Sequence, residues 1–581
     1  MISKLRNRFS LPLLARELTQ QAGRKSLYAA RTALVLGMIL WIWLAAGSRF
    51  SQDSTLSINN LGIGRSLLRE LVNVLFIGVY VLVPLLTSGS IAREKENDSL
   101  QLLLLTRLGP WAIILEKYLS RVLPMLLFLF CALPVFAYLY SLGGITEDVV
   151  FSSFYLLVLA VLQLNALCLA CSAGTGTTMS ALVTSVVIAL GVFACPVTTF
   201  LFPPLLNWLA FDGRIFNYGT VDSGWQNVFS VLMASIPIWI STGVFLILAR
   251  WLLIRRSAVK TTNLIYVFFQ KLDKVFNEWN KEMTGGIILI QDRNDLPEFE
   301  PVAWKETRKT AVGTARYLIR LLVALELPTL FFCAFLMTEG VQNVTIFYSF
   351  TLLLLGIAIL ILINKSSGLI TQERMQQTLD VVLTTPLEGK DILLQKSRGV
   401  RKLWIILMIP LATVVVSKTL IINPEHQFSY LFLIGGFIAA TAYFCIWLSI
   451  YIGLKQKRHI YAVMTTMGVI GMWCVSFKLV QLIDPSSMSR DSYTSFLMIL
   501  SPVEVLRLID QITEYFLYDE AFIFSTALGY IAYTVAMALG IRMYCLRQAD
   551  RLLGRISDEN SKPEGVPNPA EKSLQEEPSP A

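Results

Sequence analysis

Charged side chains are scarce in this chain of 581 residues. They make up 15% of the sequence, whereas 55% of the residues are apolar; an ordinary soluble domain has roughly 25% charged residues. This composition excludes a soluble enzyme, a disulfide scaffold and a disordered chain. Apolar runs recur from Ala33 to Leu539, and each is about 20 residues long, enough to cross a bilayer as a helix. The sequence therefore predicts an integral membrane protein.

Histidines, a cysteine framework and phosphate-binding loops are also missing. His426 and His459 are the only two histidines, and their predicted positions on opposite sides of the bilayer exclude a two-histidine metal site. The eight cysteines lie in or beside apolar runs, where they act as small apolar side chains, and the pair Cys168 and Cys171 is expected to pack between helices. No G-x-x-x-x-G-K-[ST] motif is present. We therefore expect no catalytic, metal or cofactor site in this chain.

Hydropathy predicts an all-α polytopic membrane protein with about twelve transmembrane helices in two sets of six. The predicted spans lie near 32–48, 70–90, 122–142, 150–171, 179–202 and 227–254, and then near 321–337, 344–363, 403–421, 429–453, 460–483 and 521–541.

The distribution of basic residues predicts the orientation. An even number of spans puts both termini on one side, and the segments on that side carry most of the 49 lysines and arginines. Both termini are therefore expected in the cytoplasm of a multi-pass protein of the cell (inner) membrane. The net charge of +9 then reflects topology and contact with anionic lipid, and nucleic acid is not an expected partner.

Two blocks of sequence recur in the two halves of the chain. Pro12, Glu17, Ala22, Tyr28 and Arg31 recur as Pro301, Glu306, Ala311, Tyr317 and Arg320, at an offset of 289 residues. Ile91, Glu94, Leu100, Leu104, Thr106, Leu108, Ile113 and Lys117 recur as Ile370, Glu373, Leu379, Leu383, Thr385, Leu387, Ile392 and Lys396, at an offset of 279 residues. Both copies begin on the cytoplasmic side, so they are predicted to be parallel repeats and the chain a fused dimer.

These patterns divide the chain into five parts. Residues 1–31 form a cytoplasmic N-terminus with an amphipathic interfacial helix, and 32–254 form the first six-helix half. Residues 255–320 form a cytoplasmic linker with a second interfacial helix, and 321–541 form the second six-helix half. Residues 542–581 form a cytoplasmic tail rich in Pro, Glu and Ser, which is predicted to be disordered.

The loop between the second and third spans of each half is the cytoplasmic segment that repeats best. In the second copy Leu379, Val382 and Leu383 share one helical face, and Thr378 lies near its start. A Gly/Pro-marked turn follows in both copies, and then a short helix that ends at Lys117 or Lys396. This arrangement predicts a helix–turn–helix at the membrane face, twice.

The same segments resemble ABC-2-type transporter permeases. Ile91-Ala92-Arg93-Glu94-Lys95 through Lys117, and Ile370-Thr371-Gln372-Glu373-Arg374 through Lys396, are similar to that family's coupling-helix pattern, an Ile-x-x-Glu-Arg start, a leucine-rich turn and a downstream Lys. The first copy departs from it, with Ser99 where Thr is usual and Arg107 at the proline site. The interfacial helices, which contain Glu17, Arg31, Glu306 and Arg320, resemble the family's elbow helices.

The resemblance implies a permease of an ATP-binding-cassette exporter that moves an unknown substrate. Two cytosolic ATPase subunits would bind ATP and Mg²⁺, dock on this chain, and shift its two halves. One copy of the fused chain per complex would suffice. The implied coupling residues are Glu94, Lys95, Leu100, Leu104, Lys117, Glu373, Arg374, Thr378, Leu379, Leu383 and Lys396. The simpler alternative is that Glu94 and Glu373 only stabilise a helix end, by about 0.3–1 kcal/mol each.

Polar residues inside the predicted spans form a third group of candidates. Glu326 lies within the seventh span, where a carboxylate suggests a role in substrate or proton handling, although it could simply be interfacial or paired. Asn73, Gln163 and Asn165 are expected to form hydrogen bonds between helices or to face a substrate cavity.

Two other classes of function remain open. A secondary transporter also builds on parallel halves but normally carries coupling-ion charges within its spans. A non-catalytic membrane scaffold has no distinguishing residues. A membrane-embedded enzyme is disfavoured, because no H-E-x-x-H motif and no carboxylate site is evident.

Overall fold

The computed structural model describes most of the chain as helices. The described residues are 12–23, 28, 32, 35–39, 63–97, 99–105, 109–189, 232–233, 235–256, 300–308, 315–338, 344–420, 424–456, 458–483, 498–511 and 520–555. Every regular element among them is helical. A bilayer offers the backbone no hydrogen-bonding partner, and an α-helix satisfies its amide and carbonyl groups internally.

The first half of the chain contributes nine of the described helices. They are α2 (Pro12–Ala22), α4 (Ile63–Thr87), α5 (Gly89–Glu96), α6 (Leu100–Leu104), α7 (Pro110–Phe130), α8 (Leu133–Ser141), α9 (Glu147–Gly174), α10 (Thr178–Ala189) and α15 (Ile236–Arg256).

The second half contributes ten. They are α17 (Pro301–Arg308), α18 (Ala315–Thr338), α19 (Val344–Met375), α20 (Leu379–Leu383), α21 (Gly389–Thr419), α22 (Pro424–Lys455), α23 (His459–Ile483), α25 (Pro502–Gln511), α26 (Glu520–Arg547) and α27 (Ala549–Leu553).

Eight helical segments within the described residues are long and apolar enough to cross a membrane. They are Leu67–Glu96, Pro110–Ser141, Glu147–Gly174, Ile236–Arg255, Phe347–Met375, Gly389–Thr419, His426–Lys455 and Ala521–Arg547. Each overlaps a span predicted from hydropathy. The short helices predicted to end at Lys117 and Lys396 are wrong, because α7 and α21 continue through these lysines into the spans. Three shorter apolar helices, Thr178–Ala189, Leu325–Met337 and His459–Cys474, overlap three further predicted spans. Most of the predicted span at 32–48 lies outside the described residues.

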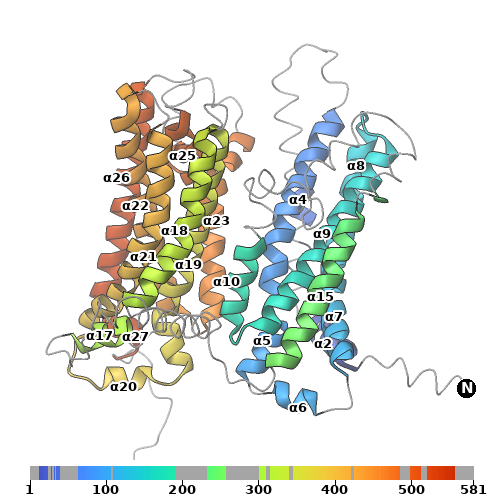
Figure 1. The fold of residues 1–581 in the computed structure, drawn as a ribbon, viewed down its shortest axis with the longest axis horizontal. Helices are drawn as coiled ribbons and strands as arrows, with labels where there is room; N and C mark the ends of the chain where they lie inside the picture. The colour runs from blue at the N-terminus through green and yellow to red at the C-terminus, as the bar shows by residue number, and fades with distance from the viewer. Residues whose placement is uncertain are drawn as a thin grey trace, which may run out of the picture.

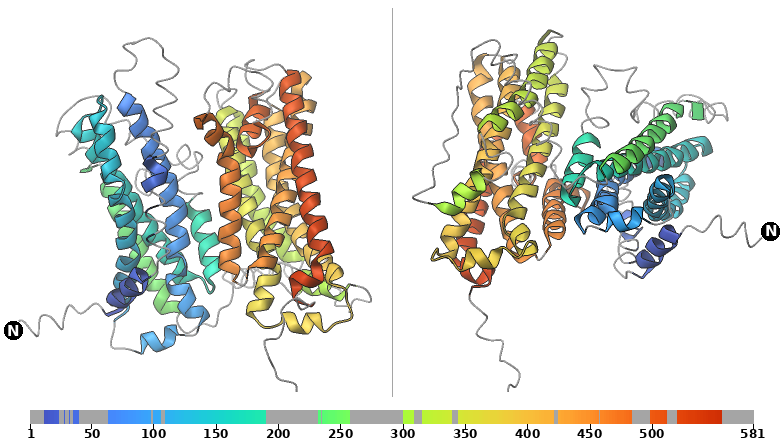
Figure 2. Two further views of the ribbon diagram at one scale, coloured as in Figure 1. Left: turned by 180° about the vertical axis from the view of Figure 1, so that it is seen from behind. Right: turned by 60° about the horizontal axis from the view of Figure 1, so that its bottom comes forward.

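The helices form two bundles that lie side by side (Figures 1 and 2). Leu71, Phe136 and Leu157 belong to the buried core of the first bundle. The second has an aromatic centre, in which the rings of Phe437 and Tyr530 stack with their centroids 5.0 Å apart. Each bundle therefore has a core of its own.

A smaller apolar cluster joins the bundles. It brings Met179 and Leu182 of α10 against Ile363 of α19 and Val463 of α23, and Figure 1 shows α10 and α23 between the two bundles. The contact between bundles thus depends on a few helices.

The short helices gather at one end of the molecule, which we call the basal end. Figure 1 shows α6 below the first bundle and α20 below the second, with α17 and α27 beside α20. Helix α2 lies against the basal part of α7, to which its backbone is hydrogen-bonded. The segments that repeat in the sequence are therefore found at the same end of both bundles.

Candidate functional site

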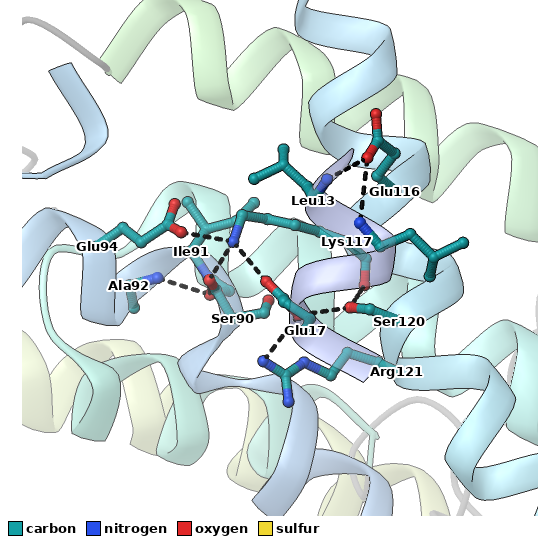
Figure 3. A network of polar contacts seen from close by, with 12 residues as sticks. Leu13, Glu17, Ser90, Ile91, Ala92, Glu94, Glu116, Lys117, Ser120 and Arg121 are labelled. Atoms are coloured by element: carbon teal, nitrogen blue, oxygen red, sulfur yellow. Dashed lines mark hydrogen bonds and ion pairs between the residues drawn. The ribbon is translucent and has the colours of Figure 1, made fainter. Parts of the chain in front are cut away.

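An almost completely buried lysine lies near the basal end of α7. The Lys117 side chain is 1% exposed, and its Nζ lies 2.7 Å from Glu94 Oε1 and 3.1 Å from Glu17 Oε1. It also donates a hydrogen bond to the Ser90 carbonyl oxygen at 3.1 Å. Figure 3 shows both carboxylates turned toward this ammonium group. Three helices, α2, α5 and α7, therefore meet at one charge.

Helix α2 is fixed to α7 at two points. Glu116 Oε2 accepts hydrogen bonds from the backbone N–H of Leu13, at 2.8 Å, and of the next residue, at 3.1 Å. A carboxylate is favourable at this N-terminal, electropositive end of a helix. One turn further on, Glu17 Oε2 accepts from Ser120 Oγ at 2.6 Å and lies 3.3 Å from an Arg121 guanidinium nitrogen.

Glu17 is ionised because positive charges surround its carboxylate. Burial raises the pKa of Glu17, but the positive charges of Lys117 and Arg121 and the hydrogen bonds from Ser120 and Lys117 outweigh it, so the pKa of the carboxyl lies below its ordinary value. Glu17 is therefore ionised at neutral pH. A buried ammonium group persists only when such a partner compensates for its lost hydration.

A second buried lysine lies in the second bundle. The Lys396 side chain of α21 is 1% exposed, and its Nζ lies 2.8 Å from Glu373 Oε1. Lys305 Nζ of α17 lies 3.5 Å from the same oxygen. Gln395 Oε1 accepts a hydrogen bond from the Val302 backbone N–H at 3.2 Å, near the start of α17. Helices α17, α19 and α21 thus also meet at one ion pair, but here α17 contributes a lysine where α2 contributes a carboxylate.

The basic residue that follows each glutamate binds a different helix. Lys95 donates to the carbonyl oxygens of Ala173 and, at 3.2 Å, Thr175, where α9 ends. Arg374 donates to the Leu454 carbonyl oxygen at 2.8 Å, where α22 ends. The last carbonyls of a helix have no partner within it, and a cation is favourable there. Each acid–base dipeptide therefore connects the basal segment to two neighbouring helices.

The short helices α6 and α20 bury one face each. Leu100 of α6 and both Leu379 and Val382 of α20 are buried, while Leu104 and Leu383 are half-buried at the ends of these helices. This apolar face holds both helices against the bundles.

The exposed side of each short helix carries apolar residues next to one polar residue, Gln101 on α6 and Asp380 on α20. Leu102 and Leu105 are 69% and 82% exposed, and Val381 on α20 is 68% exposed. Isolated exposed apolar residues are ordinary on a protein surface. Here they lie on short helices at the basal ends of both bundles, where a partner could cover them.

The carboxylates of Glu94 and Glu373 point to the lysines and not to the starts of α6 and α20. The backbone carbonyl of Glu94 accepts from the Ser99 N–H at 2.9 Å, and that of Glu373 accepts from the Thr378 N–H at 3.0 Å. The Thr378 side chain makes no capping hydrogen bond. The two glutamates therefore shape these turns through their backbone while their side chains form ion pairs.

Four predicted site residues lie wholly or partly outside the described structure. Arg31 is among the residues not described. Glu306, Arg320 and Asn73 lie within α17, α18 and α4, but their side chains are outside the described part.

Two of the predicted polar residues in the spans join helices. Asn165 Oδ1 accepts a hydrogen bond from Thr87 Oγ1 at 2.6 Å, between α9 and α4. Gln163 Nε2 donates to Ser241 Oγ at 2.7 Å, between α9 and α15. Such bonds stabilise helix packing in lipid, which is the first of the two roles that the sequence suggests.

Glu326 lies near the middle of α18. Its Oε1 forms a hydrogen bond with Thr413 Oγ1 of α21, and its Oε2 is buried with no hydrogen-bond partner among the described residues. This carboxyl group joins α18 to α21, and the structure brings it to neither lysine cluster.

Sequence reasoning missed the residues that precede Lys117 and Lys396. Glu116 and Gln395 accept backbone hydrogen bonds from α2 and α17, and both stand one position before a repeated lysine. That shared position was the available signal. Glu116 and Gln395 do not match in charge, so the repeat does not stand out at this position. Both side chains nevertheless end in an oxygen that can accept a backbone hydrogen bond, which is what the contact requires.

No family model matches the chain, and no curated protein is significantly similar to it.

Replacing the buried Lys396 by methionine should destabilise the protein strongly. Lys396→Met leaves the buried Glu373 without its close partner, and breaking a buried ion pair in this way costs about 3–5 kcal/mol. Unfolding of the purified chain in detergent, followed by thermal or chemical denaturation, measures the loss.

Two further variants control this experiment. Lys390→Met removes an exposed lysine from the same helix, whose ion pair with Glu388 is also exposed, and should change stability little. The double variant Glu373→Gln/Lys396→Met should be more stable than Lys396→Met alone, because the buried carboxylate is gone and Lys305, which loses its contact with Glu373, is 44% exposed. Equal stability of the two lysine variants would contradict the role assigned to the buried pair.

The stability of the first cluster should depend on pH through Glu17. Because the pKa of Glu17 is lower in the folded state than in the unfolded state, its contribution is fully present above the unfolded value, about 4.3. The contribution is lost as pH falls through the folded value. Wild type should therefore exceed Glu17→Gln in thermal stability at pH 7, and the difference should shrink below about pH 4. A difference that grows on acidification would show that the sign is wrong.

Proposed function

We propose that this chain is the membrane-spanning permease of an ATP-driven exporter of the ABC-2 type. ATP is hydrolysed on separate partner subunits, because the chain has no P-loop of its own. This is an integral membrane protein with eight apolar helices of spanning length among the described residues, and such an architecture suits a transporter.

The observation that carries the proposal is the pair α6 and α20. Each is a short helix at the basal end, anchored on its inner face by a buried leucine, with an exposed apolar residue on its outer side, Leu102 on α6 and Val381 on α20. Two such surfaces suit a partner that binds twice, as two copies of an ATPase subunit would.

The contacts behind the two surfaces support a tandem duplication of the chain. Glu94 and Lys117 form one ion pair, and Glu373 and Lys396, both 279 residues later, form the other. The helices around them also correspond in order and spacing. In our proposal the two bundles are two permease subunits fused into one, and one copy of the chain serves one transport complex.

The ion-pair clusters explain how force could pass from a partner to the spans. Helix α6 begins four residues after the last residue of α5. Lys117 of α7 binds both α5 and α2. Lys95 adds the end of α9. A displacement of α6 is therefore shared by several helices instead of being absorbed by a loose loop. ATP can drive such a displacement only if the partners bind the two arrangements of the bundles unequally.

The orientation follows from the distribution of basic residues. We place the basal end in the cytoplasm, where ATP and Mg²⁺ are available to the partner subunits, because lysine and arginine are concentrated in the segments on that side. Both termini then lie in the cytoplasm of a cell (inner) membrane protein.

Acidic substitutions on the exposed faces should weaken assembly with the ATPase. Leu105→Glu and Val381→Glu each place a charge in the proposed apolar contact, and each should reduce co-purification of the partner roughly tenfold, as at the centre of other interfaces. The measurement is the amount of ATP-hydrolysing protein recovered with the tagged chain in mild detergent.

Leu420→Glu is the matched control. Leu420 is 69% exposed, like Leu102, but it follows the opposite end of α21. It should leave recovery of the partner unchanged. Full recovery with the Leu105→Glu/Val381→Glu double variant would contradict the docking role, and ion-driven transport by the chain alone in vesicles would favour a secondary transporter.

A further inference from the structure

The residues after the last long helix fold back onto the turn between α20 and α21. Helix α26 ends at Arg547, and α27 (Ala549–Leu553) follows directly. We call residues 549–555 the C-terminal strap. Figure 1 shows α27 at the basal end, close to α17 and α20. The strap therefore lies beside one of the two proposed docking surfaces.

Two charged side chains of the strap bind the backbone of this turn. Arg555 donates hydrogen bonds to the carbonyl oxygens of Thr385, at 2.9 Å, and Leu387, at 2.5 Å. Asp550 Oδ1 accepts the Gly389 N–H at 3.1 Å. Gly389 begins α21, so this carboxylate also meets the electropositive end of a long helix. Hydrogen bonds to charged groups are the stronger kind.

The strap is itself held in place. Ala549 and Leu553 are buried in the core of the second bundle, in the same cluster as Leu379 of α20. Arg374 donates to the Leu552 carbonyl oxygen at 2.7 Å. The chain then reverses at Gly554, whose φ of +88° favours glycine, and this reversal brings Arg555 back toward the turn.

Arg374 thus binds two different parts of the chain. One of its guanidinium nitrogens binds the end of α22, and the other binds the strap. The dipeptide Glu373-Arg374 therefore reaches the buried lysine, the neighbouring span and the strap at once.

The corresponding turn of the first bundle is less crowded. A methyl group added at Gly109, before α7, would meet no atom within 4 Å among the described residues, whereas one added at Gly389 would lie 2.5 Å from Asp550 Oδ1. The last described helix of the first bundle, α15, ends at Arg256, and the residues that follow it are outside the described part.

We propose that the C-terminal strap locks the α20–α21 turn to the last span, with Asp550 and Arg555 as positioning residues for the second docking surface. Helix α20 can then move relative to α26 only when the strap is released. The restraint is a property of this chain alone, while its consequence for ATP-driven coupling rests on the proposed function. A protein that binds at α20 would meet a surface whose position is set by residues 549–555.

Hydrogen–deuterium exchange of the full chain in detergent tests the restraint without any partner. In Arg555→Ala, amides in residues 384–391 should exchange about tenfold faster, because two charge-assisted hydrogen bonds are lost. Arg547→Ala, at the exposed end of α26, should leave them unchanged. Peptides from α22 should exchange as in wild type in both variants, which shows that the bundle remains folded.

A pair of glycine variants gives a test of opposite sign. Alanine normally favours a helix over glycine, so Gly389→Ala would slow exchange at the start of α21 if the strap had no role. If the strap holds this turn, exchange at the start of α21 should instead be faster in Gly389→Ala, because the new methyl group displaces Asp550. Gly109→Ala should not accelerate exchange at the start of α7.

The double variant Gly389→Ala/Asp550→Ala completes the comparison. Once the carboxylate is removed, the closest atom to the methyl group is the backbone nitrogen of residue 550, at 3.1 Å instead of 2.5 Å, so Gly389→Ala should accelerate exchange much less in the Asp550→Ala background than in wild type. Unchanged exchange in Arg555→Ala, or slower exchange in Gly389→Ala, would overturn the proposal. These results do not depend on whether an ATPase binds, so they are separable from the test of the proposed function.

Discussion

An ammonium group cannot be buried at the end of a membrane helix unless a carboxylate is buried with it, and this constraint organises the basal end of the protein. Lys117 and Lys396 are both 1% exposed, and an uncompensated charge in such a place would cost several kcal/mol. Glu94 and Glu17 supply this compensation to Lys117, and Glu373 supplies it to Lys396. The segments that carry Glu94 and Glu373 are fixed at the same time, and α6 and α20 follow directly from those segments.

Hydrogen bonds and ion pairs connect these basal segments to the membrane-spanning helices. Glu116 and Glu17 bring α2 onto α7, and Lys95 and Arg374 reach the ends of α9 and α22. The short helices are consequently connected to several spans through charged and hydrogen-bonded side chains. Such a junction transmits displacement better than an isolated loop does, because its members cannot separate without leaving a charge unpaired.

Among the described residues, the contacts behind α6 differ from those behind α20. In the first, the long helix breaks between α4 and α5, and Ser172 Oγ accepts hydrogen bonds from the backbone N–H groups of Ile91 and Ala92. In the second, α19 runs unbroken from Val344 to Met375, and the strap binds the turn beyond it. The first proposed docking surface therefore follows two helices that meet at Ser88, and the second follows one unbroken helix.

The sequence was sufficient for the spans and for the position of the basal site, but not for its internal contacts. Hydropathy predicted each of the eight long helices, since a bilayer demands uninterrupted apolar stretches. The repeated block pointed to Glu94, Lys117, Glu373 and Lys396. It did not pair them, because the partners are distant in sequence and many cations were available to each carboxylate. The strap was not predicted: residues 542–581 were expected to be a disordered tail, whereas α26 runs to Arg547 and α27 follows it.

The most direct test of the account is to identify what touches α6 and α20 in the cell. A photo-crosslinking residue placed at Leu105, and in a second variant at Val381, would capture the neighbour for identification by mass spectrometry. We expect a cytosolic protein with a phosphate-binding P-loop at both positions, and the same crosslinker at Leu420 should not capture it. Capture of lipid alone, or of a neighbour without an ATPase site, at both positions would contradict the central claim.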